Sequence, residues 1–138
     1  LLGYGEEEAN LKALIKKYGL EKKFIILGFK KNPYPYIKAA DIFVHIPRIE
    51  GFGLVVTEAK ILQKPILVSD YPAALEQIEN GKSGLIVENN IDAICAGLKR
   101  LLHSESLRRK FENTLEGFTF DNKEIKKQLA QILFDEAL

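Results

Sequence analysis

Short, continuous apolar runs alternate with helical patterns along most of the 138-residue chain. Four runs have the length of a strand: KFIILGF, DIFVHI, PILVS and SGLIVE. Runs of this kind are typical of strands that are covered on both faces, as in a parallel sheet. The segments around them, at residues 6–19, 32–41, 51–63 and 73–80, have the spacing or length of helices. This order predicts an α/β fold with a doubly wound parallel sheet.

Three further helical patterns follow the last apolar run, at residues 90–104, 105–118 and 122–138. The last one has lysines beside an apolar stripe that consists of Ile125, Leu129, Ile132 and Leu133. Such a stripe could lie on a membrane surface, but it more often packs on protein. We therefore expect one domain over residues 1–120 and a separate C-terminal helix over residues 121–138.

The composition excludes several classes of protein. Lys and Arg number 20 against 19 Asp and Glu, so no global field favours nucleic acid. Apolar residues make up 46% of the chain, which is enough for a core, and no apolar run approaches the ~20 residues of a membrane span. Cys95 is the only cysteine, so an internal disulfide is impossible and a reducing compartment is expected. These features, with no visible signal-peptide pattern, predict a cytoplasmic protein, with a peripheral place at the cytoplasmic face of the membrane as the alternative.

The first eight residues have the pattern of a strand end followed by a turn. Leu1-Leu2-Gly3 resembles the end of a buried strand, and we expect the first strand and helix of the domain to precede it. The following GYGEEE has two glycines of a dinucleotide fingerprint, but Glu8 stands where the third glycine is needed. Its three acids would repel a pyrophosphate and suit a helix N-terminus, so we predict a turn rather than a dinucleotide site.

The stretch RIEGFGLVVTEA is the strongest candidate for a site. A helix is predicted to begin near Phe52 or Gly53, and its first amides would form an anion pocket at the carboxyl edge of the sheet. Glu50 precedes this helix and Glu58 lies within it. Carboxylates can accept hydrogen bonds from vicinal sugar hydroxyls, so the stretch suits a nucleotide sugar. A glycine-rich loop with two solvated acids explains the same residues equally well.

The longer segment RIEGFGLVVTEAKILQKPILVSD, which contains this stretch, resembles the E-x7-E segment of retaining glycosyltransferases of family 4. The resemblance extends over both flanks, from residue 1 to about residue 115. It implies a GT-B fold, in which this chain is the Rossmann-like, nucleotide-sugar-binding C-terminal domain. The helix at residues 121–138 would then pack on the N-terminal domain, which this chain does not contain.

The resemblance also implies roles for individual residues. Glu50 would be the catalytic residue beside the donor sugar, and Glu58 would bind the ribose hydroxyls. The loop that carries Phe29 and Lys30 would flank the base. The amides that meet the sugar and pyrophosphate would be those of Gly51, Phe52, Gly53 and Leu54. No metal and no cofactor are expected, because the helix dipole and basic residues would neutralise the diphosphate.

The implied activity is hexose transfer from a nucleotide diphosphate sugar, most commonly a UDP-sugar in this family, to a saccharide or lipid-linked acceptor. Such an enzyme would act in cell-surface polysaccharide or glycolipid synthesis, with no nucleic-acid partner. The sequence departs from the family in two ways: SDYPAALEQI replaces a Gly-Gly segment, and the Arg and Lys that neutralise the pyrophosphate would lie upstream. Two other functions remain open, a non-catalytic regulatory or binding module and a nucleotide-sugar epimerase on the same fold.

The remaining polar candidates have simpler interpretations. His45 lies within an apolar strand and is predicted to be a packed core residue rather than a base. His103 ends a helix, where a cation suits the dipole, and no metal-ligand spacing links the two histidines. Cys95 is predicted to lie in the core, and Tyr34 and Tyr36 to pack within their loop rather than stack on a base.

Overall fold

The structure is a computed structural model, and it describes residues 1–120. The chain divides into two compact units, Leu1–Tyr36 and Ile37–Leu138, and each is described by itself. The predicted C-terminal helix at residues 121–138 lies outside the described residues, so the predicted domain boundary stays a prediction. Among the helices of residues 1–120, none combines the length and the apolar composition of a membrane span.

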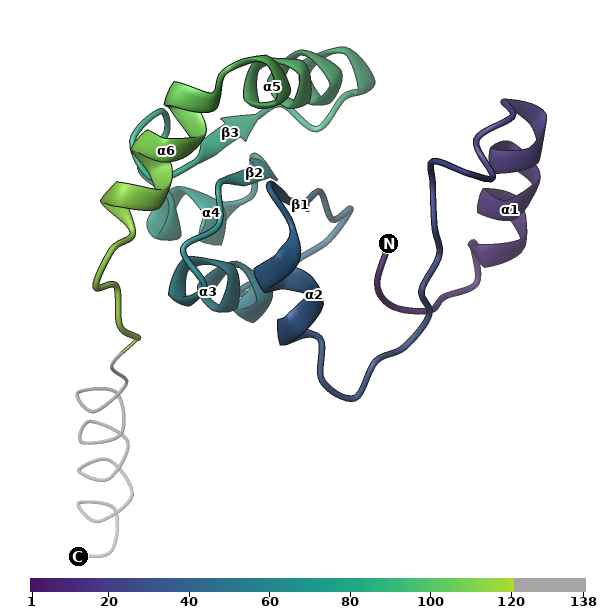
Figure 1. The fold of residues 1–138 in the computed structure, drawn as a ribbon, viewed down its shortest axis with the longest axis horizontal. Helices are drawn as coiled ribbons and strands as arrows, with labels where there is room; N and C mark the ends of the chain where they lie inside the picture. Colours follow the sequence, from purple (N-terminus) through teal and green to yellow (C-terminus); the bar gives the residue numbers. More distant parts are fainter. Residues whose placement is uncertain (121–138) are drawn as a thin grey trace, which may run out of the picture. The chain divides into compact units, whose positions relative to one another are not determined.

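The second unit is built on a parallel sheet of three strands in the order β1-β2-β3 (Figure 1). The strands are β1 (Phe43–His45), β2 (Ile66–Ser69) and β3 (Leu85–Val87). Helix α3 (Leu54–Ile61) connects β1 to β2, and α4 (Pro72–Gln77) connects β2 to β3. Parallel neighbours with helical crossovers confirm the predicted α/β fold.

The central strand β2 is buried along its whole length, as its apolar sequence predicts. Helices α5 (Ile91–His103) and α6 (Glu105–Thr114) follow β3, and each begins at a polar cap, Asn90 or Ser104, whose side chain accepts a hydrogen bond from a backbone amide. The core between these helices and the sheet consists of Leu67, Leu85, Leu101 and Phe111. The parallel pairing of the three strands places their carboxyl ends at one edge of the sheet.

The first unit contains α1 (Glu8–Lys17), and the short helix α2 (Tyr34–Ala39) begins at its end. Gly19, with a φ of 63°, follows α1, as the sequence predicts. The strand predicted over residues 24–27 is not formed, because the described residues give it one short neighbour: Leu2 and Gly28 form a single parallel bridge. Backbone hydrogen bonds join Leu1 to Ile25 and Leu27, and Gly3 to Gly28, but this pairing is too short to make a strand. Ile25 is 61% exposed, so the apolar run is not covered as a buried strand would be.

Two local predictions for the second unit are wrong. Helix α4 ends at Gln77 rather than at Asn80, because Ile78 is already extended and Asn80 pairs with Gly84. Cys95 is exposed rather than in the core. Helix α5 buries Gly97, and Cys95 lies two residues earlier, about 200° away around the helix.

Candidate functional site

The loop between β1 and α3, residues 46–53, lies at the carboxyl end of β1. Its last residue, Gly53, caps α3 in the left-handed conformation, with φ 74° and ψ 54°. Glycine adopts this conformation without steric cost, so the chain can turn sharply into the helix. Helix α3 begins at Leu54, one residue beyond the predicted start, and the N–H groups of a first helical turn have no acceptor within their helix.

Both carboxylate oxygens of Glu50 accept hydrogen bonds. Oε2 lies 2.9 Å from Nε2 of His45, and Oε1 accepts from the backbone N–H of Gly51 at 3.0 Å. The side chains of His45 and Glu50 are 21% and 26% exposed, so the pair is partly shielded from water. The prediction that His45 is a core residue is therefore wrong: it ends β1, where the ring reaches the loop instead of the interior.

Tyr71, the second residue after β2, completes this cluster. Its ring meets the His45 ring edge-on, with centroids 6.0 Å apart and an interplanar angle of 84°. Its hydroxyl is buried and has no hydrogen-bond partner within residues 1–120. Burial, together with the negative charge of Glu50, raises the pKa of Tyr71. Sequence reasoning missed both His45 and Tyr71. The signal for them is that His45 ends β1 and Tyr71 follows the end of the neighbouring parallel strand β2 by two residues.

Gln77 fixes the Gly-Phe-Gly loop to the end of α4. Its side-chain amide donates to the carbonyl oxygen of Phe52 and accepts from the hydroxyl of Thr57 at 3.0 Å. The backbone carbonyl oxygen of Gln77 accepts a hydrogen bond from Nζ of Lys60 at 2.8 Å. The Lys60 ammonium also lies 4.1 Å from the ring centre of Phe118, and burial lowers its pKa. Gln77 of α4 therefore holds the loop at Phe52, and Thr57 and Lys60 of α3 hold Gln77.

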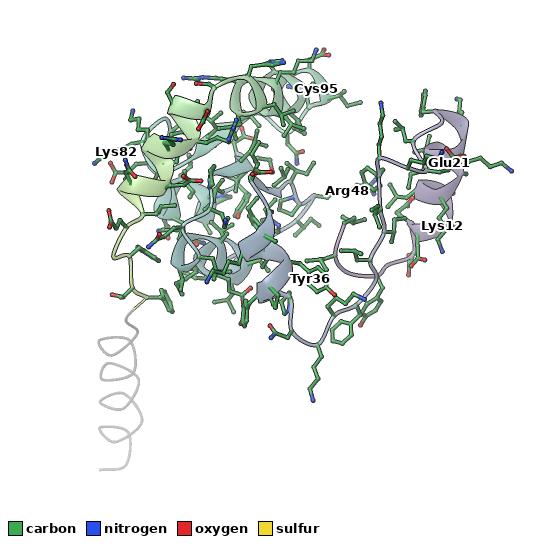
Figure 2. The ribbon with its side chains drawn as sticks, in the orientation of Figure 1. Lys12, Glu21, Tyr36, Arg48, Lys82 and Cys95 are labelled. Atoms are coloured by element: carbon green, nitrogen blue, oxygen red, sulfur yellow. The ribbon has the colours of Figure 1, made fainter. Side chains whose placement is uncertain are left out.

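Asn89 ties the same loop to the end of β3. Its side-chain amide donates to the carbonyl oxygen of Pro47 at 3.0 Å, and its backbone N–H donates to Oδ1 of Asp70 at 3.2 Å. These bonds link the segments that follow all three strands. Arg48, on the same loop, is exposed, and Figure 2 labels it.

The predicted site residues fall into two groups. Gly51, Phe52, Gly53 and Leu54 adjoin Glu50 in the loop and at the start of α3, and the partly buried Glu58 is the fifth residue of that helix. Phe29 and Lys30 belong to the first unit, where Phe29 packs edge-on against Tyr4 and the Lys30 ammonium lies 5.9 Å from the Tyr36 ring centre. Tyr34 and Tyr36 are both exposed.

The second-unit group combines hydrogen-bond donors with carboxylates. It offers backbone donors at a helix start, one carboxylate held in place by hydrogen bonds and a second on the same helix. Among residues 1–120, no group of three or more His, Cys, Asp or Glu side chains could hold a metal ion. An anion and hydroxyl groups are the ligands that such an arrangement can bind.

The sequence profile of the group 1 glycosyl transferases matches residues 1–117. The chain belongs to this family. It is 34% identical, over 115 residues, to the N-acetylgalactosamine-N,N'-diacetylbacillosaminyl-diphospho-undecaprenol 4-alpha-N-acetylgalactosaminyltransferase of Campylobacter jejuni. That alignment covers 82% of this chain and 32% of the relative, so the chain spans about a third of the length of the curated relatives it matches.

Solved structures show the same fold. Anabaena HepE in complex with UDP-glucose is similar over 98% of this chain and 40% of that protein, with a TM-score of 0.84 and 25% identity. The C-terminal domain of a group 1 family glycosyl transferase from Francisella tularensis is similar over 78% of this chain and 57% of that domain, with a TM-score of 0.70 and 29% identity. The glycosyltransferase domain described here therefore has the Rossmann-like architecture of the C-terminal half of a GT-B fold.

Proposed function

We propose that this glycosyltransferase domain binds the nucleotide-sugar donor of a retaining enzyme of family 4, with a UDP-sugar as the donor. The observation that carries the proposal is the loop after β1, where Glu50 is held beside the left-handed Gly53 at the start of α3. The Anabaena protein, whose structure is similar over 98% of this chain, binds UDP-glucose, which supports uridine as the base.

In this proposal each end of the donor meets a different carboxylate. Glu58 accepts hydrogen bonds from the ribose hydroxyls, and Glu50 contacts the donor sugar near its reacting carbon. The segment from Gly51 to Leu54 meets the sugar and pyrophosphate through the amides of Phe52, Gly53 and Leu54, since the Gly51 amide donates to Glu50. The loop with Phe29 and Lys30 flanks the base. The helix dipole of α3 contributes roughly half a positive charge towards the diphosphate.

Transfer breaks the bond between the anomeric carbon and the phosphate. The transition state carries positive charge on the sugar ring and negative charge on the departing diphosphate. Stabilising that departing charge supplies most of the catalysis, through oriented N–H groups, basic residues and the helix N-terminus, without a metal ion. Glu50 holds the sugar and eases positive charge on the ring. We assign it no nucleophilic role.

The acceptor in this proposal is a saccharide or a lipid-linked saccharide, used in cell-surface polysaccharide or glycolipid synthesis. The name of the Campylobacter relative includes a diphospho-undecaprenol acceptor, which supports a lipid-linked acceptor. In a GT-B enzyme the acceptor contacts lie mainly on the other half of the protein. This domain by itself should therefore bind nucleotide weakly and transfer no sugar.

Backbone NMR of the chain during titration with UDP, UDP-glucose and GDP tests the donor site. Uridine nucleotides should shift resonances at residues 28–31 and 50–58, and UDP-glucose should perturb Glu50 and Gly51 more than UDP does. The resonances of α6 act as an internal control. Scattered shifts, or none at saturating UDP, would contradict the assigned site.

A further inference from the structure

Resting on the proposed function, we infer that His45 is a positioning residue that fixes the Glu50 carboxylate for the donor sugar. The observation is the 2.9 Å contact between His45 Nε2 and Glu50 Oε2, outside the E-x7-E segment that defines the site. An ionised carboxylate can only accept hydrogen bonds, so Nε2 carries the proton and donates it to this bond. His45 thus acts through Glu50 and does not need to touch the donor.

The position of His45 suits this role because it stands on a rigid element. It pairs in register with Val68 of the buried central strand, whereas Glu50 lies on a loop. A loop carboxylate with several rotatable bonds loses orientation unless a fixed neighbour holds it. The hydrogen bond transfers the rigidity of the sheet to the carboxylate.

The imidazole ring itself is held by two aromatic neighbours. The Phe43 ring stacks near it at 6.5 Å with an interplanar angle of 25°, and the Tyr71 ring meets it edge-on at 6.0 Å. These contacts limit rotation of the ring, so Nε2 stays directed at Glu50. The amide of Gly51 then fixes the other carboxylate oxygen, and both oxygens have a defined direction.

The consequence is a difference between two ligands. If Glu50 contacts the donor sugar and His45 holds Glu50, loss of either side chain weakens binding of UDP-glucose while leaving binding of UDP unchanged. A change that only damages the fold would weaken the binding of UDP and of UDP-glucose alike. His45→Leu removes the hydrogen-bond donor and keeps a side chain of similar volume. His45→Gln retains an amide N–H that can reach the position of Nε2.

The test is isothermal titration of UDP and UDP-glucose into the intact enzyme that carries this chain, for His45→Leu, His45→Gln, Glu50→Gln and the double variant Glu50→Gln/His45→Leu. His103→Leu, at the exposed end of α5, is the matched control. We expect His45→Leu to lose about tenfold in UDP-glucose affinity, the typical effect of one hydrogen bond to a charged group. UDP affinity should be unchanged, His45→Gln should recover most of the loss, and the double variant should bind no more weakly than Glu50→Gln alone.

The outcomes separate this inference from the proposed function. If Glu50→Gln weakens UDP-glucose binding and His45→Leu does not, His45 has no positioning role, while the donor site stands. If His45→Leu and Glu50→Gln add as independent losses, or His45→Leu weakens UDP equally, the inference is also overturned. If Glu50→Gln leaves UDP-glucose affinity unchanged, the assignment of Glu50 to the donor sugar fails, and the inference fails with it.

Discussion

The hydroxyl of Tyr71 occupies the space that a side chain on Gly53 would need. A Cβ atom on Gly53 would lie 2.8 Å from this oxygen, and the φ of Gly53, 74°, is already unfavourable for any other residue. We expect Gly53→Ala to lower the free energy of unfolding by about 2–4 kcal/mol, from left-handed strain and overpacking together. Urea denaturation of the two proteins measures this difference.

Two variants separate these causes. Gly51→Ala is the matched control, because a Cβ there would meet nothing within 4 Å and should change stability little. Adding Tyr71→Phe to Gly53→Ala removes the clashing oxygen, so it should restore part of the loss and leave the backbone strain. Equal losses for Gly51→Ala and Gly53→Ala would contradict the described packing.

The raised pKa of Tyr71 predicts a dependence of stability on alkaline pH. The unfolded chain releases this phenol proton near pH 10, whereas burial and the Glu50 charge retain it in the folded state. The stabilising contribution is therefore complete below about pH 10 and is lost as pH rises through the folded pKa. Urea unfolding between about pH 8 and pH 11 should show a steeper fall for the unmodified chain than for Tyr71→Phe. Tyr18→Phe, at an exposed position, should follow the unmodified chain; identical curves for all three would contradict the burial of Tyr71.

The side-chain amide of Gln77 is predicted to stabilise the loop through its N–H donor. Gln77→Glu retains size and shape but cannot donate to the carbonyl oxygen of Phe52, so we expect a loss of about 1–3 kcal/mol in the free energy of unfolding. Glu76→Gln, an exposed neighbour on the same helix, is the control and should change stability by less than about 0.5 kcal/mol. Indistinguishable urea midpoints for these two variants would argue against the Gln77 contact.

Local sequence pattern predicts most of the second unit. The run Ile66–Ser69 is apolar without interruption, and it forms the fully buried central strand. Residues 54–61 include the strand-favouring Val55, Val56 and Thr57, yet they form a helix between two short strands, as the segment length indicates. The run at residues 24–27 has the same local pattern but forms no strand, because pairing depends on neighbours that local pattern does not specify.

In the candidate site too, some residues could be predicted from local sequence and others depend on strand pairing. Glu50, Gly51 and Gly53 lie within four consecutive residues, so their proximity follows from the loop and the helix start. His45 and Tyr71 are brought to Glu50 and Gly53 by the parallel pairing of β1 with β2, and single-residue preferences gave the wrong interpretation of His45. The strand order supplies this information, since residues at the carboxyl ends of adjacent parallel strands meet at one edge.

The assignment of Glu58 to the ribose carries the central claim that this domain binds a nucleotide sugar. The direct measurement is the affinity of the intact enzyme for UDP, by titration calorimetry, with Glu58→Ala compared against the control Glu76→Ala at equal folded fractions. The account predicts that Glu58→Ala weakens UDP binding by about 1–3 kcal/mol, the cost of losing hydrogen bonds to a charged group, while Glu76→Ala leaves it unchanged. UDP affinity that is the same in Glu58→Ala as in the unmodified enzyme would contradict it.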